Sequence, residues 1–155
     1  MKPLDVVSFE HRLDSLFERI IDLGDDLELQ ANWAKYLCVL VSGYLEVSVK
    51  SVFREYAKNK SDPRVFNNVN RNLKFFPNPK MDAILKTTAS FDPVWAQKLE
   101  KFSEGEVKDS VDSIVANRNL IAHGGNVGIS YIRIKNYYNN SRKLIDFMSV
   151  NFSPK

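Results

Sequence analysis

The stretch VDSIVANRNLIAHGG, Val111 to Gly125, has the pattern of an amphipathic helix and its end. On an ideal helix that turns about 100° per residue, three apolar residues of this stretch, Val111, Ile114 and Ile121, lie along one line. Val107, one turn before the stretch, lies on the same line. Arg118 lies within about 40° of the same line. A guanidinium keeps its charge, so burying it alone would cost several kcal/mol. Arg118 therefore needs an acidic partner, an anionic ligand or a groove that opens to water.

One of the two histidines of the chain, His123, ends this helix just before a glycine pair. It lies about 140° around the helix from Arg118, so the two side chains do not share a face. Asn119 is on the histidine's side at spacing i, i+4, where an amide can orient an imidazole. Gly124 and Gly125 predict a left-handed helix end, which leaves His123 beside exposed backbone.

These residues also have ordinary structural interpretations. A histidine in a last helical turn is a favourable partner of the helix dipole. An arginine on an apolar stripe can pair with a carboxylate, and Glu46, in GYLEVSVK, is an available partner on another helix. Taken one by one, the residues leave the function open.

Together, Arg-Asn-x-x-x-His at the end of an amphipathic helix in an otherwise helical chain resembles the HEPN superfamily. VDSIVANRNLIAHG is similar to the form found in bacterial HEPN domains of the RiboL-PSP type, as is the earlier segment LVSGYLEVSVKSVF. The periodicity of the chain predicts an all-α bundle of about five to seven helices, and the resemblance implies that this bundle is HEPN-like. The resemblance also implies a metal-independent endoribonuclease, as many members are, acting as a toxin or a phage-defence effector.

The resemblance assigns a catalytic role to three residues: His123 as acid or base, Arg118 as phosphate clamp and Asn119 as orienter. It implies RNA as substrate, no metal and no cofactor, and a homodimer formed through the motif helix. For a toxin it adds a cognate antitoxin protein. Many HEPN domains are instead non-catalytic RNA-binding, protein-binding or adaptor modules, and this alternative predicts that Arg118 forms a structural ion pair with Glu46.

Periodicity and capping residues predict the helices of the bundle. The predicted helices span Ser8 to Gly24, 27–60, part of 63–76, 80–91, 92–102, 104–125 and 130–152. Ser8, Asp92 and Ser130 are the expected N-terminal caps of their helices, and Pro93 is expected to be the first residue after the Asp92 cap. We find no internal repeat, and we expect residues 1–155 to form a single domain.

Charge is unevenly distributed along the chain. The net formal charge is −5 for residues 1–49, +6 for residues 50–101 and +2 for the remaining residues. Within the basic part, RVFNNVNRNLKFF places Arg64, Arg71 and Lys74 among Phe66, Phe75 and Phe76. Cations interleaved with aromatic rings suit single-stranded RNA, through phosphate pairing and base stacking. The alternative, which the pattern favours, is that the phenylalanines pack inward and the cations are solvated.

No run of about 20 apolar residues marks a membrane span, and the N-terminus is acidic where a signal peptide would be apolar. We therefore expect a cytoplasmic protein without membrane contact. Cys38, the single cysteine, lies in KYLCVLVSG and is predicted to be a buried hydrophobe. His11 is predicted to be solvated, and no spacing of ligands suggests a metal site.

Overall fold

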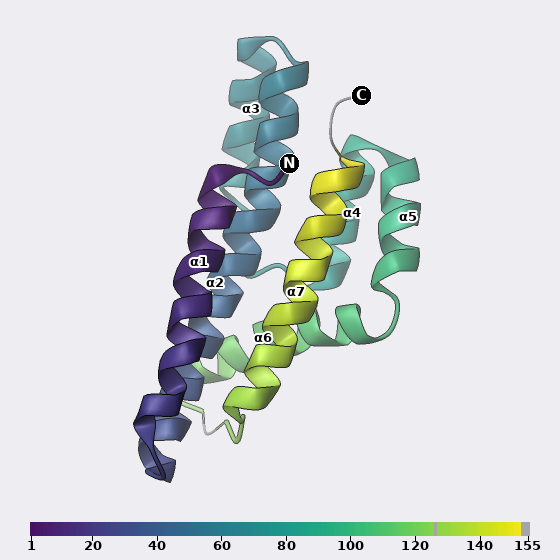
Figure 1. Cartoon of the computed structure of the whole chain (residues 1–155). Coiled ribbons are helices and arrows are strands. Elements are labelled where there is room, and N and C mark those ends of the chain that lie inside the picture. Colours follow the sequence, from purple (N-terminus) through teal and green to yellow (C-terminus); the bar gives the residue numbers. More distant parts are fainter. Residues whose placement is uncertain (126, 153–155) are drawn as a thin grey trace.

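The computed structural model describes residues 1–125 and 127–152, and within them it contains seven α-helices and one short 3₁₀ helix (Figure 1). In chain order these are α1 Leu4–Glu18, η1 Arg19–Leu23, α2 Leu27–Lys60, α3 Pro63–Leu73, α4 Met81–Phe91, α5 Pro93–Ser103, α6 Glu106–Ala122 and α7 Tyr131–Asn151. The predicted all-α bundle is confirmed.

The long helix α2 is the axis of the bundle, because α1, α3, α6 and α7 all pack against it. One face of α2 is buried, and it carries Cys38, Ser42, Leu45, Val49 and Val52. Tyr56, further along the same face, is half-buried. By length and composition α2 could also cross a membrane, which differs from the expectation that no segment of the chain could. Most of that apolar stretch is buried inside the bundle, as in the core helix of a folded domain.

Several helix ends follow local chemistry that the sequence shows. The side chain of Asp92 accepts hydrogen bonds from the backbone N–H groups of Val94 and Trp95, and Pro93 is the first residue of α5. Ser130 caps α7 in the same way. The predicted cap at Ser8 is wrong, because α1 begins at Leu4, directly after Pro3, and continues through Ser8. Residues before Ser8 already belong to the apolar face, as the full burial of Val6 shows.

A buried carboxylate fixes α1 to α2. Glu10 is only 4% exposed, and both of its carboxylate oxygens accept from the Lys2 ammonium at 2.8 Å. The hydroxyl of Tyr44 on α2 donates to the same carboxylate at 2.7 Å. Tyr138 on α7 donates to Asp14 at 3.0 Å, so the polar contacts extend to a third helix.

The helices α3 and α4 are held by different neighbours. α3 packs on α2, whereas α4 packs on α5 and α6. The segment between them is tied down at its end, because the N–H of Met81 donates to Asp112 of α6 at 2.8 Å. In Figure 1, α3 lies at the top of the view and α6 towards the bottom.

Candidate functional site

The motif helix α6 changes from buried to half-buried along its apolar stripe. Val107, Val111 and Ile114 are buried, whereas Arg118 and Ile121, further along the same line, are half-buried. The arginine is thus placed where the stripe leaves the core. Its guanidinium remains partly open to water, which lowers the cost of keeping its charge.

The described contacts of Arg118 are few and weak. Its Nη1 donates to the Oδ1 of Asn119 at 3.4 Å, which is longer than an ordinary N–H···O bond. Among the residues that the structure describes, no carboxylate lies within 4.0 Å of the guanidinium. The charge of Arg118 is therefore available to an anion.

Glu46, the predicted partner of Arg118, makes its contacts elsewhere. Its Oε1 accepts from the Lys50 ammonium at 2.7 Å, and its Oε2 accepts from the backbone N–H of Asn78 at 2.8 Å. Arg118 acts on Glu46 only through space. Burial alone raises the pKa of Glu46, but the N–H of Asn78, Lys50 and the charge of Arg118 together hold this pKa below its ordinary value.

Glu46 therefore anchors the segment between α3 and α4. Asn78, whose N–H it accepts, has a φ of 45°, a left-handed conformation that asparagine tolerates better than most residues. Sequence reasoning missed Lys50 as the partner of Glu46, although their i, i+4 spacing on one helix was a usable signal. The contacts from Asn78 and Met81 join segments far apart in sequence, and no local pattern indicates them.

His123 lies directly after α6 and is exposed. The N–H of Gly125 donates to the carbonyl of Leu120 at 2.7 Å, and that of Gly124 donates to the carbonyl of Ile121 at 3.1 Å. This is a Schellman end, in which Gly124 has a φ of 75°. A Cβ on Gly125 would lie 2.9 Å from the Leu120 oxygen, so both glycines are required for different reasons. The predicted left-handed helix end is confirmed.

Asn119 contacts the arginine and the histidine by different groups. Its side chain accepts from Arg118, and its backbone carbonyl accepts from the N–H of His123 at 3.2 Å. Within the described residues, no side-chain hydrogen bond connects Asn119 with the His123 imidazole. The Asn119 side chain therefore contacts the guanidinium and not the imidazole, and the helix end places His123.

The three basic residues predicted to contact RNA, Arg64, Arg71 and Lys74, are all exposed. Of the phenylalanines among them, Phe66 and Phe76 are half-buried, and Phe76 packs against the core. Phe75 is 79% exposed, so the expectation that all three pack inward is wrong for Phe75. It follows α3 directly, in the segment that leads to α4, and the side chains around it leave its ring in solvent.

The other candidate groups are accounted for by the fold. Cys38 is fully buried, and burial raises the pKa of its thiol to about 12, in keeping with a packing role. His11 is exposed on α1. In the part of the chain that the structure describes, no three His, Cys, Asp or Glu side chains are grouped as a metal site would require.

Comparison with known proteins gives one match. The family model described as RiboL-PSP-HEPN matches residues 8–150, which includes every helix after the first turn of α1. No curated protein and no solved structure matches the chain.

Proposed function

Because the chain belongs to the RiboL-PSP-HEPN family, we propose that it is a metal-independent endoribonuclease that uses Arg118, Asn119 and His123. The proposal rests on the surroundings of the Arg118 side chain. This side chain is half-buried where an apolar stripe meets solvent, and no described carboxylate pairs with it. A phosphate of RNA is an anion that matches the guanidinium fork.

The chemistry requires a base, an acid and positive charge. A base takes the proton of a 2′-hydroxyl, whose oxygen attacks the adjacent phosphorus. The bond from phosphorus to the 5′-oxygen then breaks, and an acid protonates that oxygen, which leaves a 2′,3′-cyclic phosphate and a 5′-hydroxyl. His123 supplies the base or the acid, since imidazole exchanges protons readily near neutral pH. Arg118 neutralises the phosphate, and Asn119 holds the guanidinium.

A homodimer through α6 is part of the proposal. Within one chain, Arg118 is on the core stripe of α6 and His123 is exposed about 140° around the helix axis. Two α6 helices that meet across a two-fold axis would bring the arginine of one chain near the histidine of the other. Leu120, which is 53% exposed on α6, supplies apolar surface for such a contact.

The cleavage test uses the purified protein and RNA in the presence of EDTA. We expect products with 2′,3′-cyclic phosphate ends, and we expect His123→Ala to abolish them. His11→Ala is the matched control, because it removes the only other histidine, which is exposed on α1. RNA that stays intact over a wide range of protein concentration, or equal activity of His123→Ala and wild type, would refute the proposal.

Sedimentation velocity tests the dimer separately. At tens of micromolar we expect a species of twice the 17.8 kDa chain mass. We expect Leu120→Glu, which puts a charge on the exposed surface of α6, to shift the protein towards the monomer. A wild-type protein that remains monomeric would contradict the shared site, and Arg118 and His123 would then have to act within one chain.

The toxin or phage-defence role rests on family membership alone. Its test is induction in a bacterial host. We expect growth arrest with the wild type and normal growth with His123→Ala. Equal growth would remove the toxin role, together with the cognate antitoxin that a toxin requires.

One observation favours a second candidate, a non-catalytic HEPN module that binds RNA or protein. The His123 imidazole has no hydrogen bond to another described side chain, whereas a catalytic histidine is usually oriented by one. This candidate predicts intact RNA in the cleavage test.

A further inference from the structure

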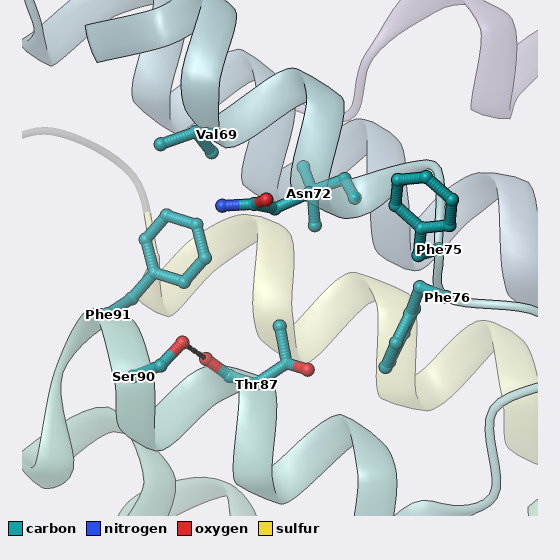
Figure 2. Close-up of a pocket in the computed structure, with 8 residues that line it drawn as sticks. Val69, Asn72, Phe75, Phe76, Thr87, Ser90 and Phe91 are labelled. Atoms are coloured by element: carbon teal, nitrogen blue, oxygen red, sulfur yellow. Dashed lines mark hydrogen bonds between the residues drawn. The ribbon is translucent and has the colours of Figure 1, made fainter.

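A groove lies between α3 and α4. It has a volume of about 470 Å³. Figure 2 shows side chains from both helices and from the segment between them directed towards it. They include Asn72 of α3, Phe75 and Phe76 of the segment between the helices, and Thr87 and Phe91 of α4. The groove is open because α3 and α4 pack on different neighbours.

Aromatic rings border the groove in two distinct environments. Phe91 is fixed, because its ring stacks on Phe53 of α2 with centroids 4.7 Å apart and planes at 11°. Phe76 is half-buried and packs against the core. Phe75 is 79% exposed, and a solvated phenylalanine ring offers a face on which a planar group can stack.

Polar groups reach the same space. In Figure 2 the carboxamide of Asn72 extends into the groove between the phenylalanines. Within the described residues, neither this carboxamide nor the hydroxyl of Thr87 has a side-chain hydrogen-bond partner. A carboxamide offers both a donor and an acceptor, which is the pattern that the edge of a nucleobase complements.

Positive charge predominates around the groove. Residues 63–91 contain five Lys or Arg and one Asp, a net charge of +4, whereas the whole chain carries +3. Arg71 and Lys74 flank Asn72 in the sequence, Lys86 precedes Thr87, and all three cations are exposed. An apolar protein segment would fit the rings but not this charge, whereas a polyanion with planar bases fits both.

We propose that the groove between α3 and α4 binds an unpaired base of single-stranded RNA, with the neighbouring phosphates on Arg71, Lys74 and Lys86. The base stacks on Phe75 and hydrogen-bonds to Asn72. The inference that this RNA is also the substrate rests on the proposed function.

The segment from Phe75 to Met81 connects this site to the motif. It begins at the groove, donates the N–H of Asn78 to Glu46, and ends at Met81, which is bound to Asp112 of α6. The charge of Arg118 acts on the same Glu46. This segment therefore joins the groove to the carboxylate on which the charge of Arg118 acts.

The binding test measures the affinity for a fluorescent single-stranded RNA of about 12 nucleotides in the full-length protein with His123→Ala, so that cleavage does not interfere. We expect Phe75→Ala to weaken binding about tenfold or more, as loss of one stacked base does. Phe102→Ala is the control, because Phe102 is also partly exposed but lies on α5 and stacks on Phe147. We expect the same RNA in a duplex to be insensitive to Phe75→Ala.

A second pair of variants keeps the test independent of aromatic packing. Asn72→Asp and Asn67→Asp introduce the same charge on exposed positions of α3, but only Asn72 borders the groove. We expect Asn72→Asp to weaken binding several-fold more than Asn67→Asp. Lys74→Ala should reduce the slope of log affinity against log salt, whereas Phe75→Ala should leave that slope unchanged.

The outcomes separate this inference from the proposed function. Cleavage of RNA with binding that neither Phe75→Ala nor Asn72→Asp weakens would overturn the groove and leave the nuclease. Groove-dependent RNA binding without cleavage would support the groove and refute the nuclease. A change of oligomeric state in Phe75→Ala without loss of RNA affinity would show a protein contact instead and overturn the inference.

Discussion

Replacing Arg118 by methionine distinguishes a functional arginine from a structural one. If Arg118 held a buried ion pair, its loss would cost about 3 to 5 kcal/mol, because an uncompensated carboxylate would remain in the core. The structure predicts a much smaller change in the free energy of unfolding, since Glu46 is already bonded to Lys50 and to the N–H of Asn78. Arg118→Met keeps an unbranched, apolar side chain on the stripe and removes the guanidinium with its charge and its hydrogen-bond donors.

The magnitude follows from three contributions. The 3.4 Å hydrogen bond to Asn119 contributes at most about 0.5 kcal/mol. The attraction between Arg118 and the partly exposed Glu46 contributes about 0 to 1 kcal/mol. Against these losses, a half-buried methionine on an apolar stripe gains about 1 kcal/mol of hydrophobic stabilisation. The variant should therefore unfold within about 1 kcal/mol of wild type while RNA cleavage is lost.

Urea unfolding, monitored by circular dichroism, measures the change in the free energy of unfolding between Arg118→Met and wild type. Lys2→Met serves as the reference for the loss of a cation from a buried carboxylate. Lys2 lies 2.8 Å from both oxygens of Glu10, whose side chain is 5% exposed. Arg142 at 3.7 Å and the Tyr44 hydroxyl remain near this carboxylate, so the loss of Lys2 should cost about 2 kcal/mol. If Arg118→Met destabilises the protein as much as Lys2→Met does, the arginine is a structural residue and our interpretation of the motif is refuted.

Three further predictions concern the scaffold. Tyr44→Phe removes a hydroxyl that donates to a buried carboxylate and should cost about 2 kcal/mol in urea unfolding, whereas the exposed Tyr36→Phe should change stability by less than about 0.5 kcal/mol; equal effects would contradict the contact. The pKa of Glu46 is lowered in the folded protein, so its ionised form stabilises the fold fully above the ordinary value of 4.5, and this stabilisation is lost as the pH falls through the lowered pKa. The melting temperature of Glu46→Gln should therefore fall less steeply with acid than that of wild type. The same pH dependence in both proteins would contradict this. Gly124→Ala should cost about 1 kcal/mol or more because its φ is 75°, whereas Gly128→Ala, with open space at its Cβ, should be nearly neutral, and the reverse order would exclude the left-handed helix end.

Local sequence determined most of the helices. The period of the apolar residues is a property of a segment by itself, so helices α2 to α7 could be predicted within a few residues of their observed ends. The caps at Asp92 and Ser130 act on groups two or three residues away, and the glycine pair after His123 acts on carbonyls three and five residues back. These contacts are local in sequence, and for this reason they are predictable too. The beginning of α1 was predicted too late because Ser8 has the type of a cap but lies inside the helix.

The environment of the candidate site depended on tertiary contacts. The sequence placed Arg118 on an apolar stripe, but only packing shows that the stripe is half-exposed there and that Glu46 binds Lys50 and Asn78. Likewise, no local pattern indicates that Phe75 stays in solvent beside a groove, because the groove exists only where α3 and α4 pack on different helices. The spacing of apolar residues along the sequence indicates which residues lie on the same side of one helix. How deeply that side is buried, and which charge meets which, is decided by segments that are distant in sequence and adjacent in space.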